Sequence, residues 1–309
     1  MTRTRWADLP LVEVRGLTKQ WGERRGVLDL SFEIAAGQVF GFLGPNGAGK
    51  STTIRLLLGL YLPTRGQVRL CGLDPTRDSV AIHRRVGYLA GELSLYPRLS
   101  GREVVERFSR LRGLTSHAYR DHLVQRFGAD LDRPIRTLST GNRQKIGLVL
   151  AFMHRPDLVI LDEPTSGLDP LVQDEFHALV RETVDDARTV FLSSHELDEV
   201  QRLADHVAII KEGRLILTDT VENIRRSAPR TVEFTFARAV DPRAFDHVPG
   251  VRVVRCADGR VGLAVAGSIG PVLRTAAELD PVDMSAKPAD LDELFLQYYR
   301  SQPSGGERV

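Results

Sequence analysis

The fold of this 309-residue chain is decided by one stretch, Gly44-Pro45-Asn46-Gly47-Ala48-Gly49-Lys50-Ser51-Thr52. It matches the phosphate-binding loop pattern of Gly, four residues and Gly-Lys-Ser. An apolar run at residues 39–43 precedes it and a helix-forming run at residues 54–58 follows it, which predicts a strand, a loop and a helix. In this pattern the loop N–H groups face phosphate oxygens, Lys50 reaches the β- and γ-phosphates, and the Ser51 hydroxyl can ligate Mg²⁺. We predict a nucleoside triphosphate site, with a plain glycine-rich turn as the alternative.

Composition limits the other classes of function. The length suits one large domain and a smaller one. The net charge is only +2, so nucleic acid is not expected as a partner. Cys71 and Cys256 lie far apart without CxxC spacing, which disfavours a disulfide framework or a zinc site. The N-terminus lacks a signal-peptide core, and the longest apolar run, residues 146–153, is far shorter than a membrane span, so we expect a cytosolic protein.

Two acids follow a second apolar run. Residues 158–161 are leucines and β-branched residues, typical of a central strand in a parallel sheet, and Asp162-Glu163-Pro164 comes next. At the carboxyl edge of such a sheet, Asp162 could hold Mg²⁺ through its water shell. Glu163 could accept a proton from an attacking water. For this segment alone, a solvated acidic turn is the alternative.

Three further motifs flank these acids. Leu138-Ser139-Thr140-Gly141-Asn142 precedes an amphipathic helix that runs toward the acidic strand, and Ser166-Gly167-Leu168-Asp169 and Phe191-Leu192-Ser193-Ser194-His195-Glu196 follow it. In this order the motifs resemble the ATP-binding-cassette ATPases, the nucleotide-binding subunits of ABC transporters, over about residues 11–220. The resemblance implies ATP and Mg²⁺ as ligands.

The resemblance also implies a role for each motif residue. Glu163 would be the catalytic base and His195 the sensor of the γ-phosphate, although a lone histidine can also be structural. Asp162 would be the magnesium residue, together with the Ser51 hydroxyl, and Asp169 would couple two subunits. The remaining residues would cradle the phosphates: Gly44, Pro45, Asn46, Gly47, Ala48, Gly49, Lys50, Ser51 and Thr52.

Two other assignments concern adenine and the opposite subunit. Trp21 stands where the family usually has a tyrosine that stacks on adenine, and indole offers a larger π-face. A partly buried surface tryptophan is the alternative. Ser139 and Gly141 would contact the γ-phosphate of ATP held by a second subunit.

The sequence departs from the family pattern at two places. The signature reads Leu-Ser-Thr-Gly-Asn instead of the commoner Leu-Ser-Gly-Gly-Gln, and Thr140 is tolerable if that position does not need a positive φ. The glutamine that normally touches Mg²⁺ and the attacking water is replaced by Gly91. We predict that the neighbouring Glu92 supplies the missing metal contact; the alternative is that the metal keeps an additional water.

These motifs imply an α/β fold of the phosphate-loop NTPase class. Residues 1–224 would form the ABC cassette, with a parallel-sheet core, an antiparallel β subdomain and a helical subdomain at about residues 93–155. Residues 225–309 would form a small accessory α+β domain, with a hairpin at Asp258-Gly259 and a last helix at residues 291–299. The run at residues 288–295 resembles the C-terminal motif of multidrug exporter subunits of the daunorubicin-resistance type.

One cassette without a membrane span implies a transport path on another polypeptide. From the resemblance we expect a homodimer that closes around ATP and drives a separate ABC-2-type permease, so the subunit would sit in the cytoplasm, on the inner face of the membrane. Two alternatives stay open. One is a soluble ABC ATPase that acts on ribosomes or DNA, and the other is a nucleotide-gated regulatory module with little hydrolysis.

Overall fold

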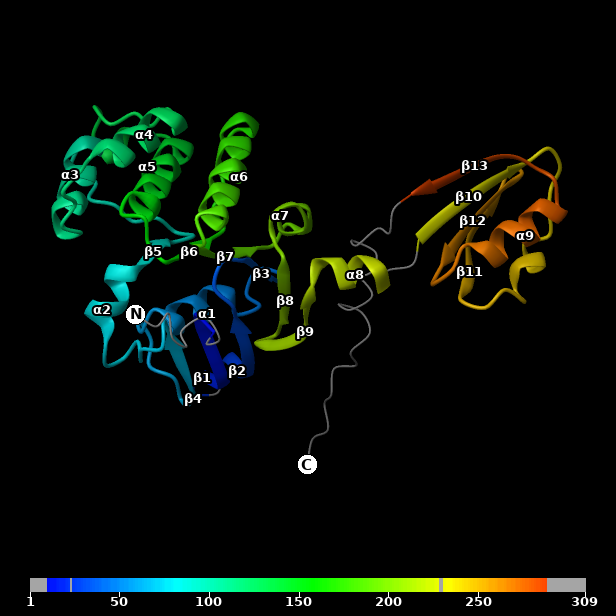
Figure 1. The fold of residues 1–309 in the computed structure, drawn as a ribbon, viewed down its shortest axis with the longest axis horizontal. Helices are drawn as coiled ribbons and strands as arrows, with labels where there is room; N and C mark the ends of the chain where they lie inside the picture. Colours follow the sequence, from blue (N-terminus) through cyan, green and yellow to red (C-terminus); the bar gives the residue numbers. More distant parts are fainter. Residues whose placement is uncertain (1–9, 23, 228–229, 288–309) are drawn as a thin grey trace, which may run out of the picture. The chain divides into compact units, whose positions relative to one another are not determined.

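A computed structural model describes residues 10–22, 24–227 and 230–287 of the chain (Figure 1). The chain forms two compact units that divide between Asp219 and Thr220. The boundary expected from the sequence, between residues 224 and 225, falls inside helix α8 (Val221–Ser227). The described part of the first unit contains a six-stranded and a three-stranded sheet, and that of the second contains a four-stranded sheet.

The six-stranded sheet has the order β5-β6-β7-β3-β8-β9, and its pairs from β5 to β8 are parallel. Strands β3, β6 and β7 are buried at every residue, which explains their continuous apolar runs. Because these three strands are neighbours, the segments that follow their carboxyl ends meet at one edge of the sheet. The strands are β3 (Val39–Leu43), β5 (Val86–Leu89), β6 (Leu158–Asp162), β7 (Thr189–Ser194), β8 (His206–Lys211) and β9 (Arg214–Thr220).

The three-stranded sheet confirms the predicted antiparallel region. Strand β1 (Val12–Trp21) pairs antiparallel with β2 (Arg24–Ile34) on one side and with β4 (Arg65–Leu70) on the other. Buried side chains of these strands share one hydrophobic core with β3 and with helix α1 (Lys50–Leu57). This shared core fixes the end of β1, where Trp21 lies, relative to the phosphate loop.

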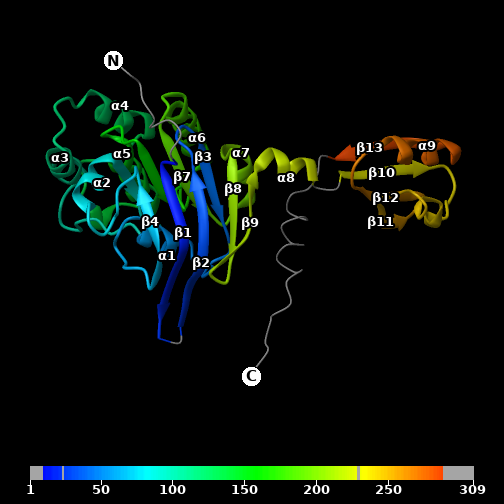
Figure 2. The same cartoon turned by 60° about the horizontal axis from the view of Figure 1, so that its bottom comes forward.

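The helices between β5 and β6 form a group of their own, visible in both views (Figure 1, Figure 2). Helix α3 begins with a capping box, in which the Ser100 hydroxyl accepts from the N–H of Glu103 and the Glu103 carboxylate accepts from the N–H of Ser100. Gly128 ends α4 in the left-handed conformation, which glycine adopts without strain. The helices of the first unit are α1, α2 (Ser79–Arg85), α3 (Gly101–Leu111), α4 (Ala118–Phe127), η1 (Ile135–Thr137), α5 (Thr140–Phe152), α6 (Pro170–Asp185) and α7 (Leu197–Leu203).

The second unit is an antiparallel sheet with helix α9 (Gly270–Glu278) packed on its buried face. The predicted hairpin is confirmed, since Asp258 and Gly259 both have positive φ between β11 and β12. The strands, in the order β11-β12-β10-β13, are β10 (Arg230–Phe236), β11 (Val251–Ala257), β12 (Arg260–Val265) and β13 (Pro281–Lys287), with the short helix η2 (Pro242–Phe245) after β10. The predicted helix at residues 291–299 and the exporter-like run at 288–295 lie outside the described residues.

Candidate nucleotide-binding site

The phosphate loop turns sharply between β3 and α1. Gly47 and Gly49 have φ angles of 80° and 112°, which glycine adopts without the strain that a Cβ would bring. Gly49 is the N-cap of α1, so no side chain caps the first turn of this helix. N–H groups at an uncapped helix start attract anions. The strand, loop and helix predicted from the sequence are confirmed.

Lys50 is buried at the start of α1, with 6% of its surface exposed. Its ammonium donates hydrogen bonds to the carbonyl oxygens of Gly44 (2.7 Å) and Pro45 (3.4 Å), and it lies 3.0 Å from Oε1 of Glu163. The carbonyl oxygens of the loop therefore hold the ammonium in place. A buried ammonium interacts more strongly with a phosphate than an exposed one would.

Asp162 ends β6 and is buried beside the end of β7. Its Oδ1 accepts a hydrogen bond of 2.5 Å from the Ser193 hydroxyl. No role was predicted for Ser193 from the sequence. The one feature that could have pointed to it is its position as a polar residue at the end of an apolar run. Burial, followed by the nearby Asp162 charge, raises the pKa of Tyr88 to about 12, so this phenol stays neutral at physiological pH.

Glu163 links three segments of the site. It has a φ angle of 52°, a left-handed conformation that costs a non-glycine residue on the order of 1–3 kcal/mol. Its N–H donates to the Ser193 carbonyl, and its own carbonyl accepts from the Gln144 side chain on α5. One carboxylate oxygen faces Lys50, and the other lies 2.6 Å from Nδ1 of His195. The hydrogen bonds of the Glu163 backbone thus hold its carboxylate toward Lys50 and His195. These are the two residues that are predicted to contact the γ-phosphate.

These segments surround a cavity of about 620 Å³. It brings together most of the predicted residues: Trp21, Pro45, Asn46, Gly47, Gly49, Lys50, Ser51, Thr52, Glu92, Asp162, Glu163 and His195. Gly26, Arg55, Gly91 and Ser166 also line it, and Gly26, Arg55 and Ser166 were not predicted. Gly44 and Ala48 belong to the same loop without lining the cavity.

Trp21 stands at the mouth of this cavity with 42% of its surface exposed. Its ring meets Tyr61 edge-on, with centroids 5.5 Å apart, and the Lys19 ammonium lies 5.4 Å from the ring centroid. Gly26 makes room for it, since a Cβ there would come within 2.5 Å of the indole. The edge contact holds the ring while leaving aromatic surface available for stacking on a base.

Gly91 abuts the carboxylate of Asp162. A Cβ at this position would lie 3.3 Å from the Asp162 carboxylate, closer than an ordinary contact. A glutamine at position 91 would therefore press on Asp162 unless the backbone shifted. Glu92 is exposed and lines the cavity, so its carboxylate is available to the same region.

The signature segment lies elsewhere on the same chain. Ser139 is exposed and caps α5, where its hydroxyl accepts from the N–H of Asn142 at 3.1 Å. Ser139, Gly141 and Asp169 do not line the phosphate-loop cavity. Asp169 caps α6 and lies 3.9 Å from the Lys145 ammonium.

Close backbone packing explains the composition of the signature. A Cβ on Gly141 would come within 2.5 Å of the Gly167 carbonyl, so only glycine permits this approach. Thr140 is helical and has no positive φ. A threonine can therefore replace the usual glycine at this position without backbone strain. Asn142 bonds both the N–H and the carbonyl of Asp130, which gives this departure from glutamine a structural function.

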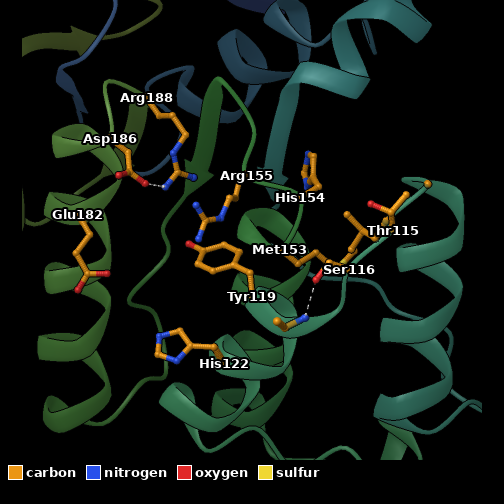
Figure 3. A pocket seen from close by; sticks show the side chains of 13 residues that line it. Thr115, Ser116, Tyr119, His122, Met153, His154, Arg155, Glu182, Asp186 and Arg188 are labelled. Atoms are coloured by element: carbon orange, nitrogen blue, oxygen red, sulfur yellow. Dashed lines mark hydrogen bonds and ion pairs between the residues drawn. The ribbon is translucent and has the colours of Figure 1, made fainter.

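A larger cavity, of about 820 Å³, lies near the ends of α5 and α6 (Figure 3). The Arg155 guanidinium stacks 4.2 Å from the Tyr119 ring centroid, and Arg188 pairs with Asp186 at 2.9 Å. None of the predicted site residues lines it. Volume alone would favour this cavity, but the phosphate loop and the two acids make the smaller one the candidate nucleotide site.

Comparison with known proteins agrees with this geometry. The ABC transporter family model matches residues 27–166. The chain is 34% identical over 300 residues to the daunorubicin/doxorubicin resistance ATP-binding protein DrrA of Streptomyces peucetius, covering 92% of this chain and 91% of DrrA. It is 34% identical over 227 residues to the bacitracin transport ATP-binding protein BcrA of Bacillus licheniformis, covering 72% and 74% of the two chains.

Solved structures give the same result. An ATP-binding subunit of an ABC transporter matches with a TM-score of 0.65 and 31% identity over 70% of this chain and 92% of its own. A dimeric post-hydrolysis cassette bound to ADP and Pi shares the fold, with a TM-score of 0.62 and 21% identity over 68% and 98% of the two chains. Every helix among the described residues is too short or too polar to cross a bilayer. The chain belongs to the ABC transporter family, as one of its ATP-binding and ATP-hydrolysing subunits.

Proposed function

We propose that two copies of this subunit close around ATP and drive export through a separate ABC-2-type permease. The observation that carries the proposal is the separation of the two halves of the site. The cavity with Lys50 and Glu163 lacks Ser139 and Gly141, which lie exposed or half-buried on the same chain. A two-fold pair would bring the signature of each copy to the phosphate loop of the other.

Within one cavity, the residues have complementary tasks. Ser51 and Asp162 offer the hard oxygen donors that Mg²⁺ prefers, and Glu92 would add a third from the place next to Gly91. When bound, Mg²⁺ would neutralise charge on the β- and γ-phosphates. Lys50 can exchange its ion pair with Glu163 for one with a phosphate, which would free that carboxylate oxygen to accept a proton from water.

His195 and the second copy complete the scheme. His195 contacts Glu163, and its half-exposed ring can also reach a ligand in the cavity. Ser139 and Gly141 would contact the γ-phosphate across the interface, while Asp169 would couple the two copies.

Residues 1–224 would form this cassette and residues 225–309 its accessory domain. The permease would hold the subunit on the cytoplasmic face of the membrane.

The export direction rests on what the relatives are called. DrrA is a daunorubicin/doxorubicin resistance protein, YbhF of Escherichia coli is a probable multidrug transporter subunit, and BcrA is a bacitracin transport protein. Transfer of such a role to this chain remains our proposal. Copurification with a membrane permease would support it, and copurification with ribosomes would contradict it.

The proposal predicts the behaviour of Glu163→Gln. The amide keeps the shape of the side chain but cannot accept the proton, so the ATPase rate should fall about 10²- to 10⁴-fold. ATP should still bind, because Lys50 and the loop remain, and an ATP-dependent dimer should accumulate. Turnover and light scattering with and without ATP measure both effects. A variant that stays monomeric with excess ATP would contradict the sandwich.

A further inference from the structure

The Arg143 side chain bonds the signature segment on both sides of Ser139. Its Nη1 donates to the Leu138 carbonyl at 2.8 Å, and its Nη2 donates to the Thr140 hydroxyl at 3.1 Å. The backbone N–H of Arg143 donates to the Ser139 carbonyl at 3.0 Å. One arginine therefore holds three successive residues, with Ser139 in the middle. No role was predicted for Arg143 from the sequence.

A guanidinium group suits this task. It is planar, presents its N–H donors in a fixed fork and stays charged at physiological pH, so two of its nitrogens can hold two acceptors at once. A hydrogen bond from a charged donor is also stronger than one from a neutral donor. Arg143 is half-buried, so water competes only in part for these bonds.

The Thr140 side chain lies between Arg143 and Gly167. Its hydroxyl accepts from the guanidinium, while its methyl carbon would lie 3.4 Å from a Cβ added to Gly167. Gly167 belongs to the segment that leads to Asp169, the proposed coupling acid. The glycine that is commoner at position 140 would offer neither the hydroxyl nor the methyl group. The departure from the family pattern thus supplies Arg143 with one of its two side-chain acceptors.

Ser139 itself is exposed, and its hydroxyl accepts from the N–H of Asn142. This bond orients the hydroxyl, while the contacts of Arg143 hold the backbone on either side. A small misplacement of a group that must meet the reacting atoms can slow a reaction on the order of 100-fold. An exposed serine that has to meet a phosphate on another copy gains most from being held in place before the copies pair.

We propose that Arg143 and Thr140 form a positioning pair that fixes Ser139 for the nucleotide of the opposite copy. The inference rests on the proposed function, in which Ser139 contacts the γ-phosphate across a two-fold interface. Arg143 acts through Ser139 and need not touch ATP. Loss of either member of the pair should slow hydrolysis. ATP binding by a single subunit should stay unchanged, because it depends on Lys50 and the phosphate loop.

The test is a double-mutant cycle on turnover. Arg143→Met keeps an unbranched apolar stem but removes both donors, and its kcat should fall about tenfold. Thr140→Val keeps the shape of threonine without the hydroxyl, and its kcat should fall about threefold. Both changes break the same bond, so the double variant should be no slower than Arg143→Met alone. Binding of a fluorescent ATP analogue to a single subunit should stay within about twofold in all three variants.

Matched controls come from the residues just before the signature. Arg136→Met removes an exposed arginine, and Thr137→Val removes a hydroxyl that donates to the Pro134 carbonyl. Both controls should keep kcat within about twofold of the wild type, and so should Thr140→Ser, which retains the hydroxyl. Circular dichroism spectra of all variants should match the wild type. If Arg143→Met does not fold, Thr140→Val against Thr140→Ser still decides the question.

The Ser139→Ala background separates this inference from the proposed function. If Arg143 acts through Ser139, Arg143→Met should slow a Ser139→Ala enzyme by less than about twofold. Wild-type kcat in Arg143→Met or Thr140→Val, or fully additive losses in the cycle, would overturn the inference. If Ser139→Ala alone turns over at the wild-type rate, the proposed function fails instead.

Discussion

The first turns of α1 and α5 are built differently, although the proposed dimer would bring both to the same phosphate. Gly49 is the N-cap of α1, and no side chain caps the first turn of this helix. Ser139 is the N-cap of α5, and its hydroxyl accepts from the N–H of Asn142. A hydroxyl that accepts one hydrogen bond still has its own O–H to donate, so the cap orients that donor instead of consuming it.

This difference separates binding from assembly. The start of α1 is ready for an anion supplied by the ligand, and Lys50 and Asp162 surround the same place. At the start of α5 the Ser139 hydroxyl already accepts from the N–H of Asn142, so this first-turn N–H is satisfied within a single copy. ATP affinity should therefore depend on the α1 side, whereas hydrolysis should depend on both. The following variants test that division.

The largest effect is expected for Lys50→Ala. It removes the buried ammonium that would face the phosphates, and the affinity for ATP should fall at least about 100-fold, or about 3 kcal/mol. Equilibrium binding of a fluorescent ATP analogue measures the loss. Lys145→Ala removes a lysine from the α5 side and should leave the affinity of a single subunit within about twofold. Equal losses of ATP affinity in Lys50→Ala and Lys145→Ala would contradict the proposed difference between the α1 side and the α5 side.

A smaller effect is expected for Ser139→Ala. Loss of a hydrogen bond to a charged phosphate should slow the ATPase about 10- to 100-fold, while ATP binding to a single subunit stays unchanged. The lost cap should also lower the free energy of unfolding by about 1 kcal/mol. Ser139→Asp keeps a capping oxygen but opposes the phosphate charge, so it should be stable and equally slow. Fast turnover in Ser139→Asp would show that only the cap matters.

The smallest effect is expected for Glu92→Ala, on the α1 side. Removal of one oxygen donor should raise the Mg²⁺ concentration for half-maximal turnover about three- to tenfold. A magnesium titration at saturating ATP measures this shift. Glu33→Ala, which removes an exposed glutamate from β2, serves as the control. If Mg²⁺ dependence and turnover are unchanged in Glu92→Ala, water takes the place of the missing glutamine.

Local pattern predicted much of the fold and of the candidate site. The phosphate loop and the acidic strand depend on short-range rules, and both appear where those rules place them. Strand β13 was missed, although Val282, Met284 and Ala286 alternate with polar residues. Its pairing partner, β10, lies in a distant part of the chain, and no local pattern reports that pairing. Ser193, Gln144 and Gly26 were missed as site residues for the same reason.

The amino-acid order was enough to establish the class of the protein, because a phosphate loop needs particular residues at particular spacings. It also identified Gly91 as an anomaly. Only the three-dimensional arrangement revealed that a side chain at position 91 would crowd the Asp162 carboxylate and that Glu163 adopts a left-handed backbone. Likewise, Glu199 is one of several neighbouring acids in the sequence, and folding alone decides that it is the one taken out of water. Burial depends on contacts between distant strands and helices, so no local pattern can report it.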